Sequence, residues 1–158
     1  MGRIGAPGCG PFSLTGQPNA MGGREVGGLA NMLANHLDIE NPDHRATVQN
    51  FWQSPTICTQ PGLKAVDLFQ ACATGKIKAL WVMSTNPAVS MPDADQVAAA
   101  IAAVPFVAVS DIMARTDTGD LAHVLLPATG WGEKDGTVTN SERRISRQRA
   151  FLPAPGDA

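Results

Sequence analysis

Charged residues are scarce in this chain of 158 residues, in which Asp, Glu, Lys and Arg make up 16% and hydrophobic residues make up 44%. This composition excludes a chain that charge repulsion keeps disordered. The formal net charge of -2 lacks the broad Lys and Arg excess that a nucleic-acid-binding surface normally needs. We therefore expect a folded protein, of the size of about one domain, that has no nucleic acid as a partner.

Long apolar segments are missing too. No run approaches the roughly 20 apolar residues of a membrane span, and the N-terminal residues hold no apolar core of a signal peptide. These two absences predict a cytoplasmic protein with no membrane span.

Cysteine is rare, and its spacing excludes two further classes. Cys9, Cys58 and Cys72 are odd in number and far apart, so they give neither a disulfide framework nor a CxxC metal motif. The three histidines are scattered as well, and we expect no metal site within this chain. Neither the G-x-G-x-x-G nor the G-x-x-x-x-G-K-[ST] phosphate-binding motif is present, and no catalytic group can be assigned.

Glycine and proline, by contrast, are abundant, and they gather at the N-terminus. Residues 1–23 contain seven glycines and three prolines, which predicts an irregular loop. So long an irregular start is unusual for a free-standing domain, because its backbone groups need neighbours to bond with. We therefore expect the chain to be a single partial domain, residues 1–158, of a larger protein.

Apolar periodicity predicts three helices in the first half of the chain. The spacing i, i+3, i+4, i+7 over residues 25–37 is typical of an amphipathic helix, and a shorter helix is expected over residues 42–53. A third is expected over residues 63–74, with Gly75 as its C-terminal cap.

The second half has the pattern of an α/β core over residues 63–150. Short apolar runs predict strands at 77–83, 104–110 and 123–127, and a helix is expected at 95–103. Because the runs do not alternate, we expect parallel strands that are buried on both faces. The predicted fold is thus a Rossmann-like parallel sheet flanked by helices, with a long irregular N-terminal segment.

Polar residues follow each predicted strand, where ligands bind in parallel sheets. Asp111 is the strongest candidate, because a carboxylate can accept hydrogen bonds from a purine edge or a ribose diol; the alternative is that it only caps the following turn. Asn86 is either a ligand contact or a turn residue. Lys134 either reaches a ligand or belongs to a charged surface turn. Four arginines in residues 143–149 favour a charged edge strand, or contacts with an anionic cofactor or a neighbouring domain.

Three ordered blocks of the sequence resemble one known family. The blocks are PFSLTGQPNAMGGREVG at residues 11–27, STNPAVSMPD at residues 84–93, and LPATGWGEKDGT with NSERR at residues 126–144. Together they resemble the molybdopterin oxidoreductases of the dimethyl sulfoxide reductase family, and within it the assimilatory nitrate reductases.

This resemblance implies an oxidoreductase that reduces nitrate to nitrite by two electrons. The implied cofactors are molybdenum bis(molybdopterin guanine dinucleotide) and a [4Fe-4S] cluster, and the implied partners are the remaining domains of the parent enzyme and an electron-donor protein or subunit. By motif position, Asn86, Ser110, Asp111 and Lys134 would contact one guanine dinucleotide in a Rossmann-like domain.

Some of the family's pattern is absent from this chain. The four closely spaced cysteines of the cluster are missing, and no cysteine stands where the molybdenum ligand does. The resemblance therefore implies a central fragment that is inactive by itself. Two alternatives stay open, a fragment of a related formate dehydrogenase and a non-redox nucleotide-binding α/β module.

Overall fold

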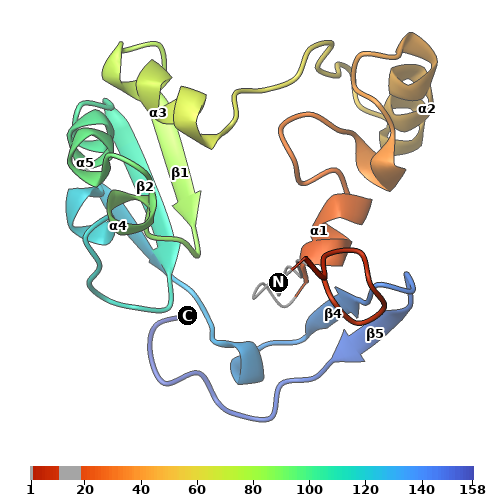
Figure 1. Cartoon of the computed structure of the whole chain (residues 1–158). Helices are drawn as coiled ribbons and strands as arrows, with labels where there is room; N and C mark the ends of the chain where they lie inside the picture. Colours follow the sequence, from red (N-terminus) through yellow and green to blue (C-terminus); the bar gives the residue numbers. More distant parts are fainter. Residues whose placement is uncertain (1, 11–18) are drawn as a thin grey trace.

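A computed structural model of the chain describes residues 2–10 and 19–158 (Figure 1). Its main element is a three-stranded sheet in the order β1-β2-β3, with both neighbouring pairs parallel. The α/β class and the three expected strands are confirmed, and the strands are β1 (Ala79–Met83), β2 (Phe106–Asp111) and β3 (Val124–Pro127).

Two helices cover one face of this sheet. They are α3 (Ala65–Ala73) and α5 (Ala94–Ala102), which confirms both predictions, and Gly75 has the positive φ of 71° expected of a cap. A short helix that the sequence did not predict, α4 (Pro87–Ser90), packs against α5. The helices and strands enclose the main core, formed by Phe69, Cys72, Leu80, Val82, Val97, Ala100, Ile101, Val104, Val107 and Val109.

The opposite face of the sheet is largely exposed, apart from Ala108 in its centre, which corrects the expectation of strands covered on both faces. Residues alternate along β1, so that Leu80 and Val82 are buried whereas Trp81 and Met83 are exposed. All four residues of β3 are exposed as well. Figure 1 shows α3 and α5 on one side of the sheet, and no described helix covers the other side.

The N-terminal part differs most from its prediction. Helix α1 (Ala20–Glu25) occupies part of the expected irregular segment 1–23; residues 2–10 are irregular as expected, and residues 11–18 lie outside the described residues. The helix predicted over residues 25–37 is wrong. The chain leaves α1 at Glu25 and forms only a single 3-10 turn, η1 (Ala34–His36), before residue 37.

Gly27 is the reason that the helix stops. Its φ is +77°, which an L-residue rarely adopts, and a Cβ atom there would lie 2.7 Å from the Ala34 nitrogen. The N–H of Gly28 also bonds back to the Gly23 carbonyl at 2.7 Å. The apolar spacing across this segment thus belongs to a turn in which Leu33 is buried and Val26 is exposed.

Gly27→Ala is expected to lower the free energy of unfolding by at least about 2 kcal/mol, because it adds left-handed strain to a clash with backbone. Gly23→Ala is the matched control, since its Cβ would meet nothing within 4 Å and α1 would gain a better helix former. Urea unfolding of both variants measures the difference. Equal stability of the two variants would contradict this account of the turn.

A second, smaller core holds the N-terminal part together. It consists of Leu33, Ile39 and Val48, the last from α2 (Pro42–Trp52), where the sequence predicted a helix. Asn41 caps α2 by accepting hydrogen bonds from the N–H groups of residues 43 and 44. Figure 1 shows α1, α2 and a hairpin at one end of the molecule and the parallel sheet at the other.

The hairpin is an antiparallel pair, β4 (Gly136–Thr139) and β5 (Ile145–Gln148). Of the edge strand expected over residues 143–149, strand β5 confirms the middle part, whereas Arg143 lies in the preceding turn with a φ of 62°. Two 3-10 turns, η2 (Gly119–Leu121) and η3 (Trp131–Glu133), lie on either side of β3 in the chain. No helix in the described part of the chain is long and apolar enough to cross a membrane.

Candidate nucleotide site

A pocket of about 480 Å³ lies beyond the carboxyl ends of β2 and β3. Its lining includes Asp111, the last residue of β2, Ala128 and Gly130, which follow β3, and residues 155–158. The volume falls within the roughly 300–1,000 Å³ of small-molecule sites, and the position is the one at which parallel sheets bind ligands. The pocket is therefore the best candidate site in the described residues.

Asp111 is the acidic side chain that β2 delivers to this pocket. Its residue is half-buried, and its Oδ1 accepts a hydrogen bond from the Met113 N–H at 2.9 Å. This bond closes a turn of the kind that Asp commonly forms. Among the described residues no donor reaches Oδ2, so the carboxylate keeps acceptor capacity toward the pocket. The Asp111 side chain can thus cap the turn and accept a hydrogen bond from a ligand at the same time.

Glu133 is a pocket residue that sequence reasoning missed. Its Oε2 accepts a 2.6 Å hydrogen bond from the Gly130 N–H, and this contact folds the turn after β3 against the pocket. Sequence reasoning treated Glu133 as part of an exposed charged turn. The signal that could have identified it is the spacing of three residues between Gly130 and Glu133, which is the spacing of a capping box.

Asn86 does not line this pocket, and its amide is held by a buried threonine. The Asn86 Oδ1 accepts hydrogen bonds from the Thr118 N–H at 3.1 Å and from the Thr118 hydroxyl at 2.7 Å. Because a backbone N–H can only donate, the atom facing it must be the oxygen. The amide nitrogen therefore points the other way, toward Asp117 at 3.5 Å. Toward a ligand, Asn86 can act only as a hydrogen-bond donor.

Ser110 and Lys134 also lie outside the pocket lining. The Ser110 hydroxyl accepts a 2.9 Å hydrogen bond from the Trp81 indole N–H on the exposed face of the sheet. The Lys134 ammonium lies 6.0 Å from the centre of the Trp131 ring, at a distance typical of a cation–π contact. Of the four predicted contacts, the structure places only Asp111 in the 480 Å³ pocket.

Arg143 organises a separate charged cluster between α1 and the hairpin. One of its terminal nitrogens donates to Glu25 Oε2 and to Asn35 Oδ1, both at 2.7 Å, and His36 donates to the other Glu25 oxygen at 3.1 Å. The Arg143 hydrogen bond, followed by that of His36, lowers the pKa of Glu25 below its usual value. This cluster borders a pocket of about 370 Å³ and fixes α1 to the hairpin.

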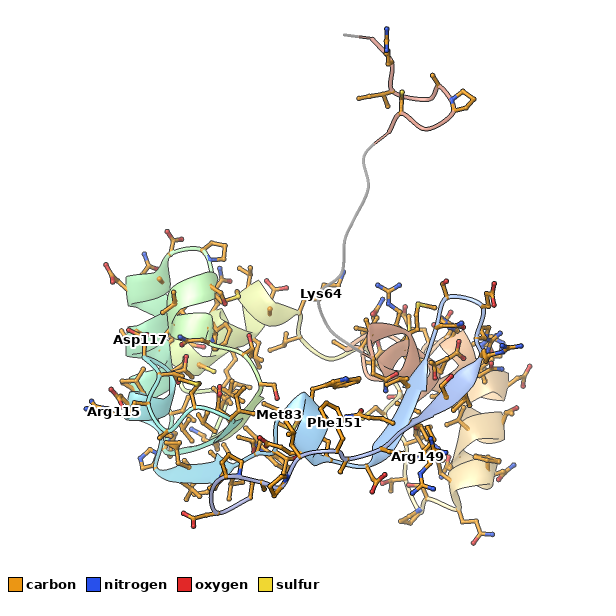
Figure 2. All side chains as sticks on the ribbon, turned by 90° about the horizontal axis from the view of Figure 1, so that it is seen from below. Lys64, Met83, Arg115, Asp117, Arg149 and Phe151 are labelled. Carbon is orange, nitrogen blue, oxygen red and sulfur yellow. The ribbon has the colours of Figure 1, made fainter. Side chains whose placement is uncertain are left out.

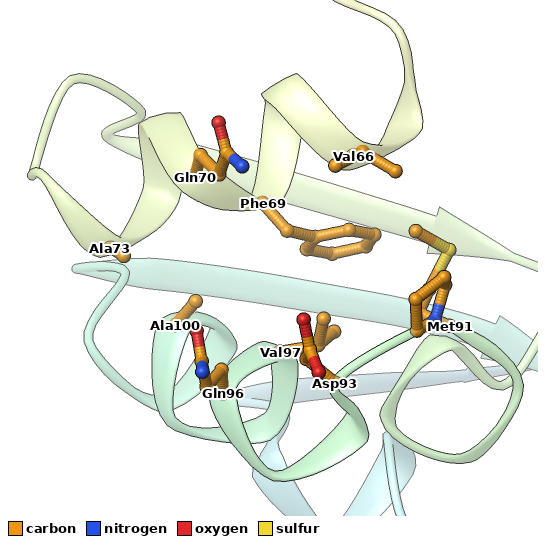
Figure 3. Close-up of a pocket in the computed structure, with 10 residues that line it drawn as sticks. Val66, Phe69, Gln70, Ala73, Met91, Asp93, Gln96, Val97 and Ala100 are labelled. Carbon is orange, nitrogen blue, oxygen red and sulfur yellow. The ribbon is translucent and has the colours of Figure 1, made fainter.

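A third cavity lies between α3 and α5 (Figure 3). Phe69, Met91 and Val97 form its apolar part, with Gln70 and Gln96 nearby. Its volume of about 100 Å³ is too small for a nucleotide. Within residues 2–10 and 19–158, no group of three or more His, Cys, Asp and Glu side chains could hold a metal ion.

The whole sequence, residues 1–158, matches the molybdopterin oxidoreductase family. A nitrate reductase from Klebsiella oxytoca is 60% identical over 99% of this chain and 18% of its own length. A nitrate reductase from Shewanella frigidimarina is 58% identical over 100% of this chain and 17% of its own length. The chain thus spans less than a fifth of these two relatives.

More distant relatives carry two different names. The assimilatory nitrate reductase catalytic subunit of Bacillus subtilis is 37% identical over 99% of this chain and 22% of its own length. The F420-dependent formate dehydrogenase 2 subunit alpha of Methanococcus maripaludis is 36% identical over 99% of this chain and 23% of its own length. At this level of identity the sequence does not separate the two substrates.

Proposed function

Because this chain belongs to the molybdopterin oxidoreductase family, we propose that it is part of a nitrate reductase and there helps to hold a guanine dinucleotide of the molybdenum cofactor. The observation that carries the proposal is the identity of 60% to a nitrate reductase over nearly the whole chain. The parent enzyme, meaning the longer protein of which the chain is a part, would reduce nitrate to nitrite.

The pocket beyond β2 and β3 fits one end of such a cofactor. Its volume of about 480 Å³ suits the nucleoside part of one guanine dinucleotide rather than the complete cofactor, which contains two of them. The Asp111 carboxylate has acceptor capacity there, and guanine presents two N–H donors on its Watson–Crick edge. Neighbouring residues are small, such as Ala128 and Gly130, which lets a ligand approach the backbone.

In this proposal the chain's own residues bind the guanine dinucleotide and orient it. Asp111 accepts from the guanine base or its ribose, while the Glu133 bond to Gly130 keeps the turn after β3 in place. Asn86 presents its amide N–H₂ to an acceptor, and Lys134 supplies positive charge for a phosphate. When bound, the molybdenum cofactor supplies the two-electron redox chemistry.

The other parts of the reaction lie elsewhere in the parent enzyme. We place the [4Fe-4S] cluster, the molybdenum ligand and the substrate pocket in its remaining domains, and assign it an electron-donor protein as partner and the cytoplasm as location. In this arrangement the chain is one partial domain with Rossmann-like topology, and it is inactive when isolated.

A formate dehydrogenase is the second candidate, favoured by the 36% identity to such a subunit. The identity to the Klebsiella oxytoca nitrate reductase is 60%, more than 20 percentage points higher, and this difference favours nitrate as the substrate.

Purified parent enzyme tests the proposal directly. We expect molybdenum and iron by elemental analysis, guanine nucleotide on acid release, and nitrite formation from nitrate with a chemical reductant. Formate oxidation without nitrate reduction would favour the second candidate. Protein without molybdenum and without either activity would overturn both and favour a non-redox nucleotide-binding module.

A further inference from the structure

Three residues in a strained backbone conformation gather around one carboxylate between α1 and the hairpin. Six residues other than glycine have a positive φ in the described part of the chain, and half of them belong to the charged cluster around Glu25. These three are Asn35, His36 and Arg143, with φ values of 57°, 58° and 62°. The left-handed region is unfavourable for side chains with a Cβ atom, and such residues persist only where other contacts hold them.

The hairpin turn shows what Arg143 costs. Residues 141–143 form a three-residue loop, in which the Asn140 N–H bonds to the Arg144 carbonyl at 3.1 Å and the Arg143 N–H bonds to the Asn140 carbonyl at 3.0 Å. The third position of such a loop is left-handed, and glycine suits it best. An arginine there weakens the turn, so its side chain must contribute something that glycine cannot.

That contribution is a pair of hydrogen bonds to two other segments. One terminal nitrogen of Arg143 donates to Glu25 in α1 and to Asn35 in η1, both at 2.7 Å. His36 in η1 donates to the second oxygen of Glu25 at 3.1 Å. Hydrogen bonds between charged groups are stronger than neutral ones. The cluster can therefore hold both left-handed residues of η1 in place.

Helix α1 depends on such outside contacts. It has only six residues, two of which are glycines, and an isolated helix of this length does not persist in water. Besides the contacts of Glu25, the Asn19 Oδ1 accepts a hydrogen bond from the Thr139 N–H of β4 at 2.9 Å. Figure 2 shows α1 beside the hairpin, whose strand β5 leads to the labelled Arg149.

We infer that Arg143 is a strained latch, which holds α1 and η1 against the hairpin and releases both together when its bonds to Glu25 and Asn35 break. Backbone strain favours the open form, because opening lets the left-handed residues relax, and the charged hydrogen bonds favour the closed form. Glu25 and Arg143 also line the pocket of about 370 Å³, so opening the latch removes part of its wall. The inference does not depend on the substrate or on the guanine dinucleotide.

Arg143→Gly in the full-length parent enzyme separates the latch from the turn. Glycine suits the left-handed position, so β4 and β5 should exchange their amide hydrogens no faster than in the unmodified enzyme. Residues 20–36 should exchange at least about tenfold faster, because nothing then holds α1 and η1 closed. Hydrogen exchange, read by mass spectrometry on peptides from the two segments, measures both rates.

Two outcomes of this experiment would overturn the inference. Unchanged or slower exchange of residues 20–36 would show that Arg143 does not hold them. Equal acceleration of residues 20–36 and of the hairpin strands would show a general loosening, in which the side chain of Arg143 has no role apart from the turn.

Glu25→Gln tests the carboxylate at the centre of the latch. Glutamine keeps the size of the side chain, but its amide N–H₂ would face one of the two donors, Arg143 or His36. Exchange of residues 20–36 should therefore be faster in this variant too. A rate equal to that of the unmodified enzyme would contradict the assignment of Glu25 as the group that the latch holds.

Arg147→Ala is the matched control on the same hairpin. Arg147 is an exposed arginine of β5, and its ion pair with Asp135 at 3.4 Å does not involve α1 or η1. Exchange of residues 20–36 should stay within about twofold of the unmodified rate. Acceleration as large as in Arg143→Gly would contradict a role special to Arg143.

Discussion

Asp111→Ala in the parent enzyme is expected to weaken cofactor binding at least about tenfold, because the guanine donors would lose a carboxylate that contributes about 1–3 kcal/mol per bond. The side chain is fixed at the end of β2, and only its Oδ1 is used, by the Met113 N–H. Molybdenum and guanine nucleotide content per purified chain measure the loss. Nitrate reduction per chain should fall in proportion, since enzyme without cofactor is inactive.

Asp111→Asn separates the two roles of this residue. Asn forms the same turn as Asp, because its Oδ1 can accept from the Met113 N–H, but its amide places N–H₂ against the guanine donors. Cofactor content should therefore fall in this variant as well. Normal content in Asp111→Asn together with low content in Asp111→Ala would reduce Asp111 to a turn cap.

Asp67→Ala is the matched control for this pair. Asp67 is an exposed carboxylate in the first turn of α3 and makes no side-chain hydrogen bond in the described residues. Asp120 is less suitable, because it forms an ion pair with Arg115 at 2.9 Å, which also lowers the pKa of Asp120.

The parallel sheet could be predicted from the sequence because its signals are local. Each strand is a short apolar run that polar or proline residues end, and α5 between β1 and β2 has a regular apolar spacing. The same rules placed Asp111 at a strand end, and the structure places it in a pocket there. A local sequence pattern is therefore sufficient to predict a feature that depends on one strand or helix alone.

The predictions from the sequence are wrong where the structure depends on a contact with another segment of the chain. Residues 25–37 have helical apolar spacing, yet Gly27 packs against the backbone near Ala34, and this contact ends the helix. Burial on one face of β1 could not be predicted either, because the apolar run 79–83 is the same whether Trp81 meets solvent or a helix. The Glu25–Arg143 contact joins residues that are 118 positions apart, and no spacing rule reaches so far.

Thr118→Val should destabilise the α/β part of the chain by about 2–4 kcal/mol, because it removes two buried hydrogen bonds and leaves the Ala88 N–H without a partner. Thr118 is completely buried. Its hydroxyl donates to Asn86 Oδ1 at 2.7 Å and accepts from the Ala88 N–H at 3.1 Å. Valine has nearly the same shape, so the loss would reflect these two bonds and not a cavity. Urea unfolding measures it.

The same substitution tests how Asn86 is oriented. Without the Thr118 hydroxyl, only the Thr118 N–H still holds Asn86 Oδ1, at 3.1 Å, and α4 loses the bond that fixes its first turn to the loop before η2. Cofactor content of the parent enzyme should then fall along with stability. Thr137→Val is the matched control, because Thr137 is exposed on β4 and forms no side-chain hydrogen bond in the described residues. Equal stability of the two valine variants would show that the Asn86–Thr118 contact does not stabilise the junction between the start of α4 and the loop before η2.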